Sequence, residues 1–260
     1  MIDVQKKDGV ARVMLNRPDV RNAFDDALIK VLTETFRALD ADASVKAVVL
    51  GGAGPAFCAG ADLNWMKRMS TYGHDENVRD ARALADMLST LANLGKPTIA
   101  RVHGPAFAGG TGLVAACDMA VGAPEAKFCF SEAKLGLSPA TISPYVMRAI
   151  GAREASRYFL TAEVFDAQEA LRIGMLSALV PAVDLDSTID SILKNLLAGG
   201  PAAHARIKEL IRDVAWRPID DALKSDTARR IAEIRASPEG KEGIASFLDK
   251  RKPKWPSAKS

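Results

Sequence analysis

A glycine cluster between an apolar strand and an apolar helix constrains this chain more than any other feature. The stretch reads Arg101-Val-His-Gly-Pro-Ala-Phe-Ala-Gly-Gly-Thr-Gly-Leu-Val-Ala-Ala-Cys-Asp118. Gly109, Gly110 and Gly112 carry no Cβ, so they let the backbone turn sharply and approach a ligand closely. A helix that begins there leaves its first N–H groups without an intrahelical partner. The cluster therefore predicts a place that can hold a negatively charged oxygen.

Two other interpretations of the cluster stay open. A dinucleotide-binding turn needs the pattern GxGxxG, but Gly109-Gly-Thr-Gly112 does not match it, no Walker lysine follows, and the segment lies mid-chain. The glycines can also serve only the close packing of a helix against its neighbours. The pattern argues against the first alternative and leaves the second in place.

A second small-residue segment lies upstream of the glycine cluster. Lys46-Ala-Val-Val-Leu-Gly51 is a short apolar run, typical of a strand buried on both faces, and the loop after it contains Ala59-Gly-Ala-Asp62. Both small-residue segments thus follow a predicted strand. Two backbone N–H donors from two such loops can converge on one thioester carbonyl oxygen and stabilise an enolate as charge develops there.

Strands and helices alternate over the first half of the chain, and helices dominate after Leu135. Short β-forming runs predict strands, and apolar residues at helical spacing predict helices. The expected strands are a hairpin closing at 10–15, then 46–51, 96–103, 119–121, 127–132 and 177–180. The expected helices are 25–40, 77–94, one from the cluster to about 117, 142–150, 152–160, 166–173, 184–197, 201–214, 219–236 and 241–250. This order predicts an α/β fold with a mainly parallel sheet. We divide it into a core domain, 1–195, and a C-terminal helical region, 196–260.

Composition and charge limit the classes of function. The 260 residues are 48% hydrophobic and 26% charged, as in an ordinary globular protein. A formal charge of +3 disfavours a nucleic-acid partner, and the basic run 250–254 is typical of a solvated terminus. The three cysteines form no CxxC pair and are expected to be reduced. Without an apolar signal core or a membrane-length segment, we expect a soluble cytoplasmic protein with no membrane partner.

Glu132 is the candidate acid–base residue. In an extended Phe128-Cys-Phe-Ser-Glu132 segment the side chains alternate between faces, so Glu132 shares a face with Phe128 and Phe130. Burial on an apolar face raises the pKa of a carboxylate toward that of a useful general acid or base. The alternative is that the strand ends by Ser131 and that Glu132 is solvated. The pattern alone leaves both open.

Other catalytic patterns are absent from the sequence. His74, His103 and His204 lie far apart without HxxxH or HExxH spacing, so we expect no metal site. No serine lies in a GxSxG nucleophile elbow. The tryptophan and methionines of 65–69 either line an acyl pocket or belong to the core or a lid.

Four motifs together resemble the enoyl-CoA hydratase/isomerase (crotonase) family. They are Asn16-Arg-Pro with Asn22-Ala23, Phe57-Cys-Ala-Gly-Ala-Asp-Leu63, His103-Gly with Gly109-Gly and Ala116-Cys-Asp118, and Phe128 with Glu132 and Leu135-Gly136. Their order and spacing cover essentially the whole chain. The resemblance implies a crotonase-like spiral of ββα units with a C-terminal helical region, assembled as a homotrimer or a dimer of trimers. It also implies an acyl-CoA thioester substrate, of which coenzyme A is a part, and no separate cofactor.

The resemblance also implies where the site lies. The family's two oxyanion donors fall on the backbone N–H groups of Ala61 and Gly109, and its later glutamate falls on Glu132. Coenzyme A is expected along the 16–23 turn and the 59–63 loop. The last helix is expected to close over the nucleotide, often from the adjacent subunit, which gives the basic tail a phosphate-binding role. The implied substrate- and CoA-binding residues are Arg21, Ala23, Ala59, Gly60, Asp62, Leu63, Gly110, Phe247 and Lys250.

Two departures from the family pattern bear on the reaction. Hydratases of this family commonly carry two glutamates, and the earlier one falls on Gly112, so that carboxylate is missing. The glycine-rich turn common after Leu137-x-Pro is here Ser138-Pro-Ala-Thr-Ile-Ser-Pro144. Together with 60–66 and 142–145, these departures resemble the bacterial methylglutaconyl-CoA hydratase branch, which serves leucine degradation.

Our primary hypothesis is a hydro-lyase that adds water across the C2–C3 double bond of an enoyl-CoA, with a branched or carboxylated acyl group such as that of 3-methylglutaconyl-CoA. Glu132 moves the proton between water and C2, and Thr141, Ser143 or the substrate's own carboxylate orients the water. Because Gly112 removes one carboxylate, a Δ3,Δ2-enoyl-CoA isomerase with one glutamate is the alternative. A catalytically quiet acyl-CoA or RNA-binding member of the fold is the third hypothesis.

Overall fold

A six-stranded sheet runs through the protein in a computed structural model, which describes residues 1–255. The strand order is β1-β2-β3-β4-β6-β9, and every neighbouring pair except β1–β2 is parallel. The strands are β1 (Ile2–Lys7), β2 (Val10–Leu15), β3 (Ala47–Gly52), β4 (Thr98–Val102), β6 (Met119–Gly122) and β9 (Ala178–Leu179). The mainly parallel sheet and its opening hairpin are therefore confirmed.

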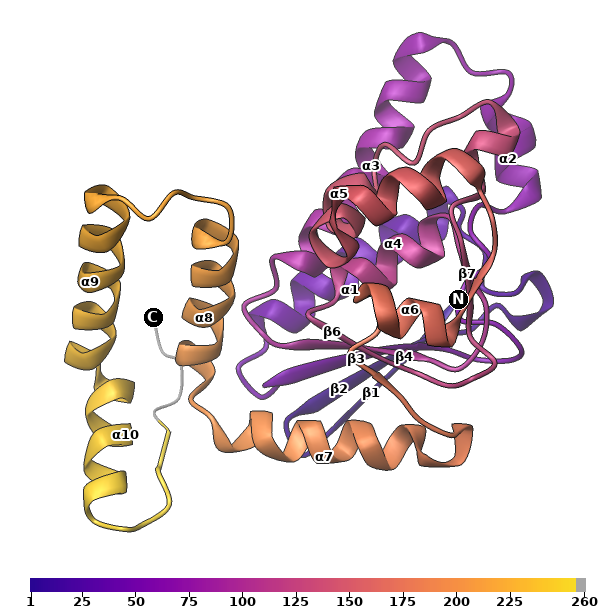
Figure 1. The fold of residues 1–260 in the computed structure, drawn as a ribbon. Coiled ribbons are helices and arrows are strands. Elements are labelled where there is room, and N and C mark those ends of the chain that lie inside the picture. The colour runs from indigo at the N-terminus through magenta and orange to yellow at the C-terminus, as the bar shows by residue number, and fades with distance from the viewer. Residues whose placement is uncertain (256–260) are drawn as a thin grey trace.

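Helices cover both faces of this sheet (Figure 1). The helices of the described residues are α1 (Asp26–Ala41), α2 (Leu63–Met69), α3 (His74–Ala92), α4 (Gly109–Ala116), α5 (Ser143–Thr161), α6 (Ala167–Ile173), α7 (Leu185–Ala198), α8 (Pro201–Val214), α9 (Asp221–Ala236) and α10 (Pro238–Leu248), of which the last three lie beside the core. Strand β3 shows why a central strand is apolar throughout. Val48 and Leu50 face the main core, which includes residues of α1, α3 and α4, whereas Ala47 and Val49 face a second core with α7.

Of a small second sheet, the sequence predicts only the middle strand, as part of the expected strand 127–132. It consists of β5 (Ala106–Phe107), β7 (Lys127–Cys129) and β8 (Phe165–Asp166), in the order β5-β7-β8. The two-residue strands β5 and β8 are too short to show the alternation that predicts a strand. The sheet matters for the site because β5 leads directly into α4 and pairs with β7 in parallel.

The helices predicted at 142–150 and 152–160 form one long element with a break. Within α5, Gly151 has φ +75° and ψ +161°, which is not a helical conformation. A positive φ of this kind is easily adopted only by glycine, so the break falls where the sequence supplies one. The two predicted segments are therefore confirmed, although they are joined end to end.

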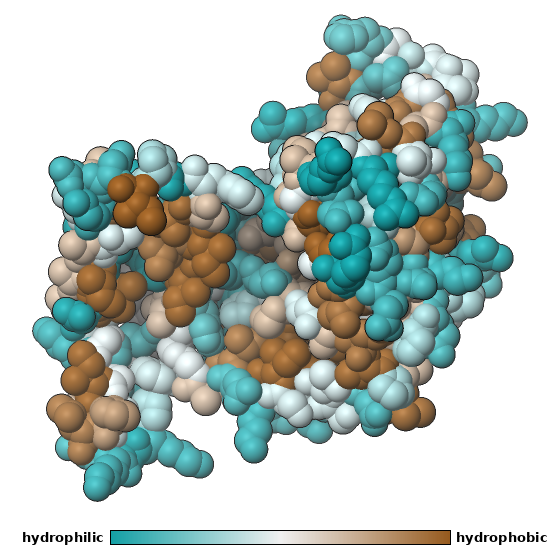
Figure 2. All heavy atoms as spheres, in the orientation of Figure 1, coloured by the Kyte–Doolittle hydropathy of each residue, from teal (hydrophilic) through white to brown (hydrophobic). Residues whose placement is uncertain are grey.

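Helices α8, α9 and α10 project from the side of the core (Figure 1). A partly buried contact ties α8 to the core, because Lys208 Nζ donates to Asp118 at 2.7 Å and to the carbonyl of Lys96 at 3.0 Å. Hydrophobic side chains gather on the exposed surface of these helices (Figure 2). The exposed residues of this kind are Ile207, Ile211, Trp216, Ile219, Ile231, Ile244, Phe247 and Leu248. The division of the chain at residue 195 stays a prediction.

Cys58, Cys117 and Cys129 are all free. Burial raises the pKa of Cys58 and of Cys117 to about 12, so both thiols stay protonated at neutral pH. Over residues 1–255, no helix combines the length and the apolar character needed to cross a membrane.

Candidate active site

The loop after β3 lies directly against β5. Cys58 forms a parallel bridge with Ala106, and its carbonyl accepts a hydrogen bond from the Phe107 N–H at 2.9 Å. Gly60 has φ +94°, and a Cβ at this position would lie 3.2 Å from the Cβ of Ala108. Such close passage favours glycine, which has no Cβ and tolerates a positive φ. The fold thus brings together the two small-residue segments that the sequence treats as partners.

The Ala61 N–H group lies between two backbone groups that are both hydrogen-bonded to Phe24. The Phe24 N–H donates to the Gly60 carbonyl at 2.7 Å, and the Asp62 N–H donates to the Phe24 carbonyl at 2.7 Å. These two bonds form a parallel bridge between Phe24 and Ala61, and they use the groups on either side of Ala61. Among the described residues, the Ala61 N–H itself has no acceptor.

The backbone just before α4 is strained in a way that directs the Gly109 N–H. Ala108 has φ +47° and ψ −117°, a combination that costs an alanine about 1–3 kcal/mol. It is held on both sides, because its N–H donates to Cys129 at 2.8 Å and its carbonyl accepts from Gly112 at 3.1 Å. Gly109 is the first residue of α4, so its N–H has no intrahelical acceptor, and residues 1–255 supply no other.

The two free donors belong to segments in contact, and the positive end of the α4 dipole adds to their effect. An oxygen within reach of both the Ala61 and the Gly109 N–H groups receives two backbone hydrogen bonds. Such an arrangement binds an oxyanion more strongly than a neutral carbonyl, because the donors are already oriented. This end of the sheet can therefore stabilise negative charge on a carbonyl oxygen.

The predicted strand 127–132 is confirmed only over 127–129, whereas the predicted burial of the Glu132 carboxylate is right. Strand β7 ends at Cys129, and Ser131–Leu135 forms a 3₁₀-helix that closes on Gly136 at φ +71°. Glu132 is half-buried, its Oε2 is buried without a hydrogen-bond partner in the described chain, and burial raises its pKa. The alternative is right that the strand ends by Ser131, and it is wrong that the Glu132 side chain is solvated.

The β5–β7 pairing brings the segment that carries Glu132 next to the segment that enters α4. Phe107 pairs with Cys129, so the residues that enter α4 and those that lead to Glu132 leave adjacent strands at the same edge. Parallel strands present their carboxyl ends at one edge of a sheet, which is where sites of open α/β folds lie. Three of the residues implied by the resemblance, Ala61, Gly109 and Glu132, thus belong to one part of the molecule.

The residues expected to bind coenzyme A divide into exposed and enclosed ones. The Ala59 N–H donates to the Arg21 carbonyl at 3.0 Å, so the 21–24 and 59–62 segments run side by side. The side chains of Arg21 and Leu63 are exposed, and Leu63 is 81% exposed. In contrast, Ala23, Gly60 and Gly110 are buried, so they can contribute only backbone or shape.

Asp62 has a structural task that the sequence does not reveal. Its carboxylate caps α2 by accepting from the Asn64 N–H at 2.9 Å, and Arg17 approaches it at 3.2 Å. Arg17 also pairs with Asp25 at 2.9 Å and donates to the Ala23 carbonyl at 2.7 Å. Arg17 therefore fastens the 59–62 loop to the 17–25 turn.

Asn22 is a second residue whose role the sequence pattern does not show. It is fully buried at φ +58°, accepts from the Arg17 N–H at 2.8 Å and donates to the carbonyls of Ala53 and Ala56 at 2.9 Å each. A buried side-chain amide in a turn commonly replaces backbone hydrogen bonds in this way. The only sequence signal of this role is the asparagine itself at the end of the 16–22 turn.

Of the aromatic and methionine residues in 65–69, Trp65 belongs to the core.

The structure does not bring Phe247 and Lys250 to this site within one chain. Phe247 lies on α10 and is 82% exposed, and Lys250 follows the helix at φ +52°. Helix α10 and the α2–α4 region lie on opposite sides of the molecule (Figure 1). These two residues therefore can reach such a site only on another molecule.

Position 112 is enclosed. A Cβ on Gly112 would lie 2.9 Å from the Cβ of Ile142, a separation that real structures essentially never show. The sequence lacks a carboxylate at position 112, and Ile142 fills the space that such a side chain would need.

The described residues contain no group of three or more histidine, cysteine, aspartate or glutamate residues placed to hold a metal ion.

Comparison with known proteins decides the family. Residues 5–258 match the family described as enoyl-CoA hydratase/isomerase. The chain belongs to this family. The hydroxycinnamoyl-CoA hydratase-lyase of Pseudomonas fluorescens is 32% identical over 257 residues, covering 95% of this chain and 92% of that protein. An enoyl-CoA hydratase of Mycobacterium tuberculosis is 31% identical over 253 residues, covering 97% and 95%.

Two solved structures with high similarity to this chain agree with this assignment. A crystal structure of an enoyl-CoA hydratase from Shewanella pealeana superposes with a TM-score of 0.95 at 40% identity, covering 98% of this chain and 95% of that one. AtuE of Pseudomonas aeruginosa superposes with a TM-score of 0.92 at 36% identity, covering 97% and 98%. The protein is therefore an enzyme of the crotonase fold, as the resemblance in its sequence implied.

Proposed function

We propose that this enzyme is an enoyl-CoA hydratase that adds water across the C2–C3 double bond of an acyl-CoA thioester. One arrangement carries the proposal: two free backbone N–H groups on touching segments, with a half-buried carboxylate at the same edge of the fold. The donors suit a carbonyl oxygen that gains negative charge, and the carboxylate suits proton transfer next to that carbonyl.

In this mechanism the thioester oxygen lies between the N–H groups of Ala61 and Gly109. Attack of water at C3 moves electrons through C2 onto this oxygen, so an enolate develops. Because both donors are already oriented, their hydrogen bonds strengthen as the charge appears and lower the barrier rather than only tightening substrate binding.

Glu132 manages the protons. Its ionised carboxylate takes a proton from water as the water oxygen bonds to C3, and it returns that proton to C2 as the enolate collapses. The elements of one water are added and Glu132 is ionised again. Burial raises the pKa of Glu132, which makes it a stronger base than an exposed glutamate. The Ser143 hydroxyl donates to the Ala140 carbonyl at 2.9 Å, which favours Thr141 or a substrate carboxylate for orienting the water.

The proposal extends to the acyl group and the assembly. The departures at 138–144 support a branched or carboxylated acyl group such as that of 3-methylglutaconyl-CoA, in leucine degradation in the cytoplasm. Coenzyme A is placed along Arg21, Ala23, Ala59, Gly60, Leu63 and Gly110, with Asp62 holding the loop. A homotrimer or a dimer of trimers supplies Phe247 and Lys250 from a neighbour. The exposed apolar residues of α8–α10 support such an assembly.

A Δ3,Δ2-enoyl-CoA isomerase is the alternative that a specific observation favours. Moving a proton from C2 to C4 needs one base and an oxyanion hole. Ile142 closes position 112, so Glu132 has no carboxylate partner there. Hydration requires in addition a water molecule bound in the site, so the two reactions are easy to separate by experiment.

The deciding experiment supplies purified enzyme separately with 2-enoyl-CoA thioesters, including 3-methylglutaconyl-CoA, and with a 3-enoyl-CoA. Loss of the conjugated thioester absorbance together with a product heavier by one water supports hydration. Rapid conjugation of the 3-enoyl substrate without addition of water to any 2-enoyl substrate supports the isomerase instead. Thioester binding without turnover across the panel supports the catalytically quiet alternative.

Glu132→Gln tests the proton-transfer residue. We expect kcat to fall by about 10²–10⁴-fold, the usual contribution of a positioned acid–base group, while acyl-CoA binding persists. Glu125→Gln is the matched control, because Glu125 is exposed on a loop of the same core. Turnover of the Glu132 variant close to that of the control would remove Glu132 from its role.

A further inference from the structure

The three glycines in the first turn of α4 each face a neighbour at the place of a Cβ. A Cβ on Gly109 would lie 2.7 Å from the Phe24 ring, and one on Gly110 would lie 2.9 Å from the Cβ of Cys58. One on Gly112 would lie 2.9 Å from the Cβ of Ile142. The turn that carries the proposed oxyanion donor is thus held from three directions by three separate segments.

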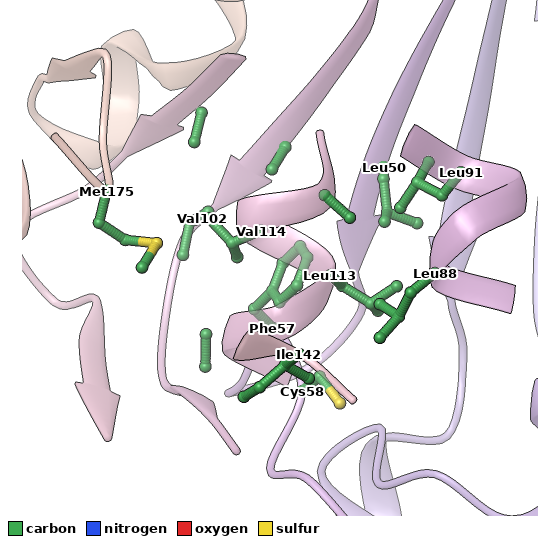
Figure 3. Packing of buried hydrophobic residues seen from close by; sticks show 14 of the residues in the cluster. Leu50, Phe57, Cys58, Leu88, Leu91, Val102, Leu113, Val114, Ile142 and Met175 are labelled. Carbon is green, nitrogen blue, oxygen red and sulfur yellow. The ribbon is translucent and has the colours of Figure 1, made fainter. Parts of the chain in front are cut away.

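The contact at Gly112 is made by a packed, branched side chain, whereas the atom nearest to a Cβ on Gly110 is the backbone carbonyl oxygen of Cys58. Ile142 is 1% exposed, and the atoms nearest to the added Cβ include its own branched Cβ rather than only the end of a flexible chain. A β-branched side chain has few alternative rotamers, so it can withdraw only if its backbone moves. On the other side, Leu88 of α3 lies 3.8 Å from the same point. Figure 3 shows Ile142 and Cys58 with Leu113 and Val114 of α4.

Ile142 also belongs to the segment that carries Glu132. The Leu137 N–H donates to the Glu132 carbonyl at 3.0 Å, and the Ser143 N–H donates to the Pro139 carbonyl at 2.9 Å. The chain from Glu132 to the start of α5 is therefore a series of short hydrogen-bonded turns. A shift of Ile142 is transmitted in one direction to α4 and in the other toward Glu132.

We propose that Ile142 is a positioning residue that sets the spacing between the Gly109 N–H and Glu132 and limits the site to one carboxylate. The proposal rests on the proposed function of that site. With Ile142 in place, position 112 admits no side chain, so no second acid–base group can lie on α4 there. Ile142 touches neither substrate nor reacting atoms; it acts by fixing the two segments that do.

The first test compares two identical substitutions at fully buried isoleucines. Ile142→Ala and Ile189→Ala both remove core volume, but Ile189 belongs to the second core, on the face of the sheet that α7 covers. We expect both variants to lower the melting temperature. Only Ile142→Ala lowers kcat, by roughly 10-fold or more, because small displacements of catalytic groups are costly. Ile142→Val restores most of kcat. Equal kcat values for the Ile142→Ala and Ile189→Ala variants would overturn the proposal.

The second test asks whether the two positions are coupled. Gly112→Ala alone is expected to lower both kcat and the melting temperature, and Gly112→Ala combined with Ile142→Ala is expected to recover part of the melting temperature. The Gly112→Glu/Ile142→Ala variant is expected to show a second ionisation in the pH profile of kcat/KM. A fully tolerated Gly112→Ala contradicts the proposal, as does a double variant with purely additive losses.

Failure of the proposed function is distinguishable from failure of this inference. The melting-temperature cycle between positions 112 and 142 needs no substrate, so it reports on the contact whichever reaction is catalysed. An active Glu132→Gln variant would refute the function and leave that cycle unchanged. Conversely, an inactive Glu132→Gln variant with no coupling between Gly112 and Ile142 would keep the function and refute the positioning role.

Discussion

The oxyanion end of the core and the C-terminal helices are built in opposite ways. At the core end, a Cβ added to Gly60, Gly109, Gly110 or Gly112 would crowd an atom of a neighbouring segment. Helices α8–α10 instead expose apolar side chains, and a groove of about 460 Å³ lies between α8 and α9. One region is complete within the chain, whereas the other presents surface that suits a partner.

This difference separates two kinds of site residue. Ala61, Gly109 and Glu132 are placed by contacts inside one chain, so their geometry follows from folding alone. Phe247 and Lys250 are held in α10 and just after it, away from the site of their own chain (Figure 1). If they act on coenzyme A as proposed, their contribution depends on assembly. Substitutions in the two regions should therefore fail in different ways.

Apart from loss of the Glu132 carboxylate itself, the largest effect is expected from Gly109→Ala at the core end. The new Cβ would meet the Phe24 ring at 2.7 Å, so the first turn of α4 must shift and its N–H must turn away. Loss of one oxyanion donor typically lowers kcat by about 10²–10³-fold. Steady-state kinetics on the accepted enoyl-CoA measure this loss, with KM changing much less than kcat.

Gly95→Ala is the control for that substitution. A Cβ on Gly95 would meet its neighbours at 3.5 Å and 3.6 Å, which is ordinary van der Waals contact. This variant should keep kcat within about twofold of the wild type, as surface changes usually do. If Gly109→Ala behaves like Gly95→Ala, the α4 turn is not an oxyanion donor and the contrast between the two regions loses its catalytic meaning.

A smaller, different effect is expected in the C-terminal helices. Phe247→Ala should raise KM for the acyl-CoA by about 10-fold and leave kcat nearly unchanged, because only a contact to the coenzyme A portion is lost. Leu248→Ala, also on α10 and 72% exposed, serves as the neighbouring control.

Mixed assemblies test whether that contact comes from another chain. Co-refolding the Phe247→Ala protein with the Glu132→Gln protein gives some subunits an intact Glu132 next to a partner with an intact Phe247. The mixture should then show a fraction of sites with normal KM, which neither protein has alone. Kinetics equal to the sum of the separate proteins would show that no chain completes its neighbour's site.

Periodic elements are predicted well from the sequence because their signals are local. The run 46–51 is apolar at every position because β3 is buried on both faces, and that pattern is visible without a structure. Glu132 shows the limit. Its burial depends on a 3₁₀ turn closed by Gly136 and on a two-residue strand pairing, and neither leaves a periodic pattern. The role of Ile142 leaves no local signal either, since it lies in a contact with Gly112, thirty positions earlier in the chain.

The smallest predicted effect concerns the cost of keeping Glu132 buried. Burial raises the pKa of Glu132 above its ordinary value of 4.5, so the folded state prefers the protonated form. The stability associated with that preference is fully present below the unfolded-state pKa and is lost as the pH rises through the higher folded-state pKa. Glu132→Gln cannot ionise, so it avoids this loss. The variant should match the wild type in melting temperature near pH 4 and exceed it by about 1–3 °C at pH 8. Thermal denaturation at both pH values measures this difference, with Glu125→Gln as the exposed control.

A wild-type protein that gains stability relative to Glu132→Gln between pH 4 and 8 would mean that the carboxylate is stabilised in its charged form. In that case the buried Oε2 has a partner in solution, and the core end is less strictly organised for catalysis than its packing indicates.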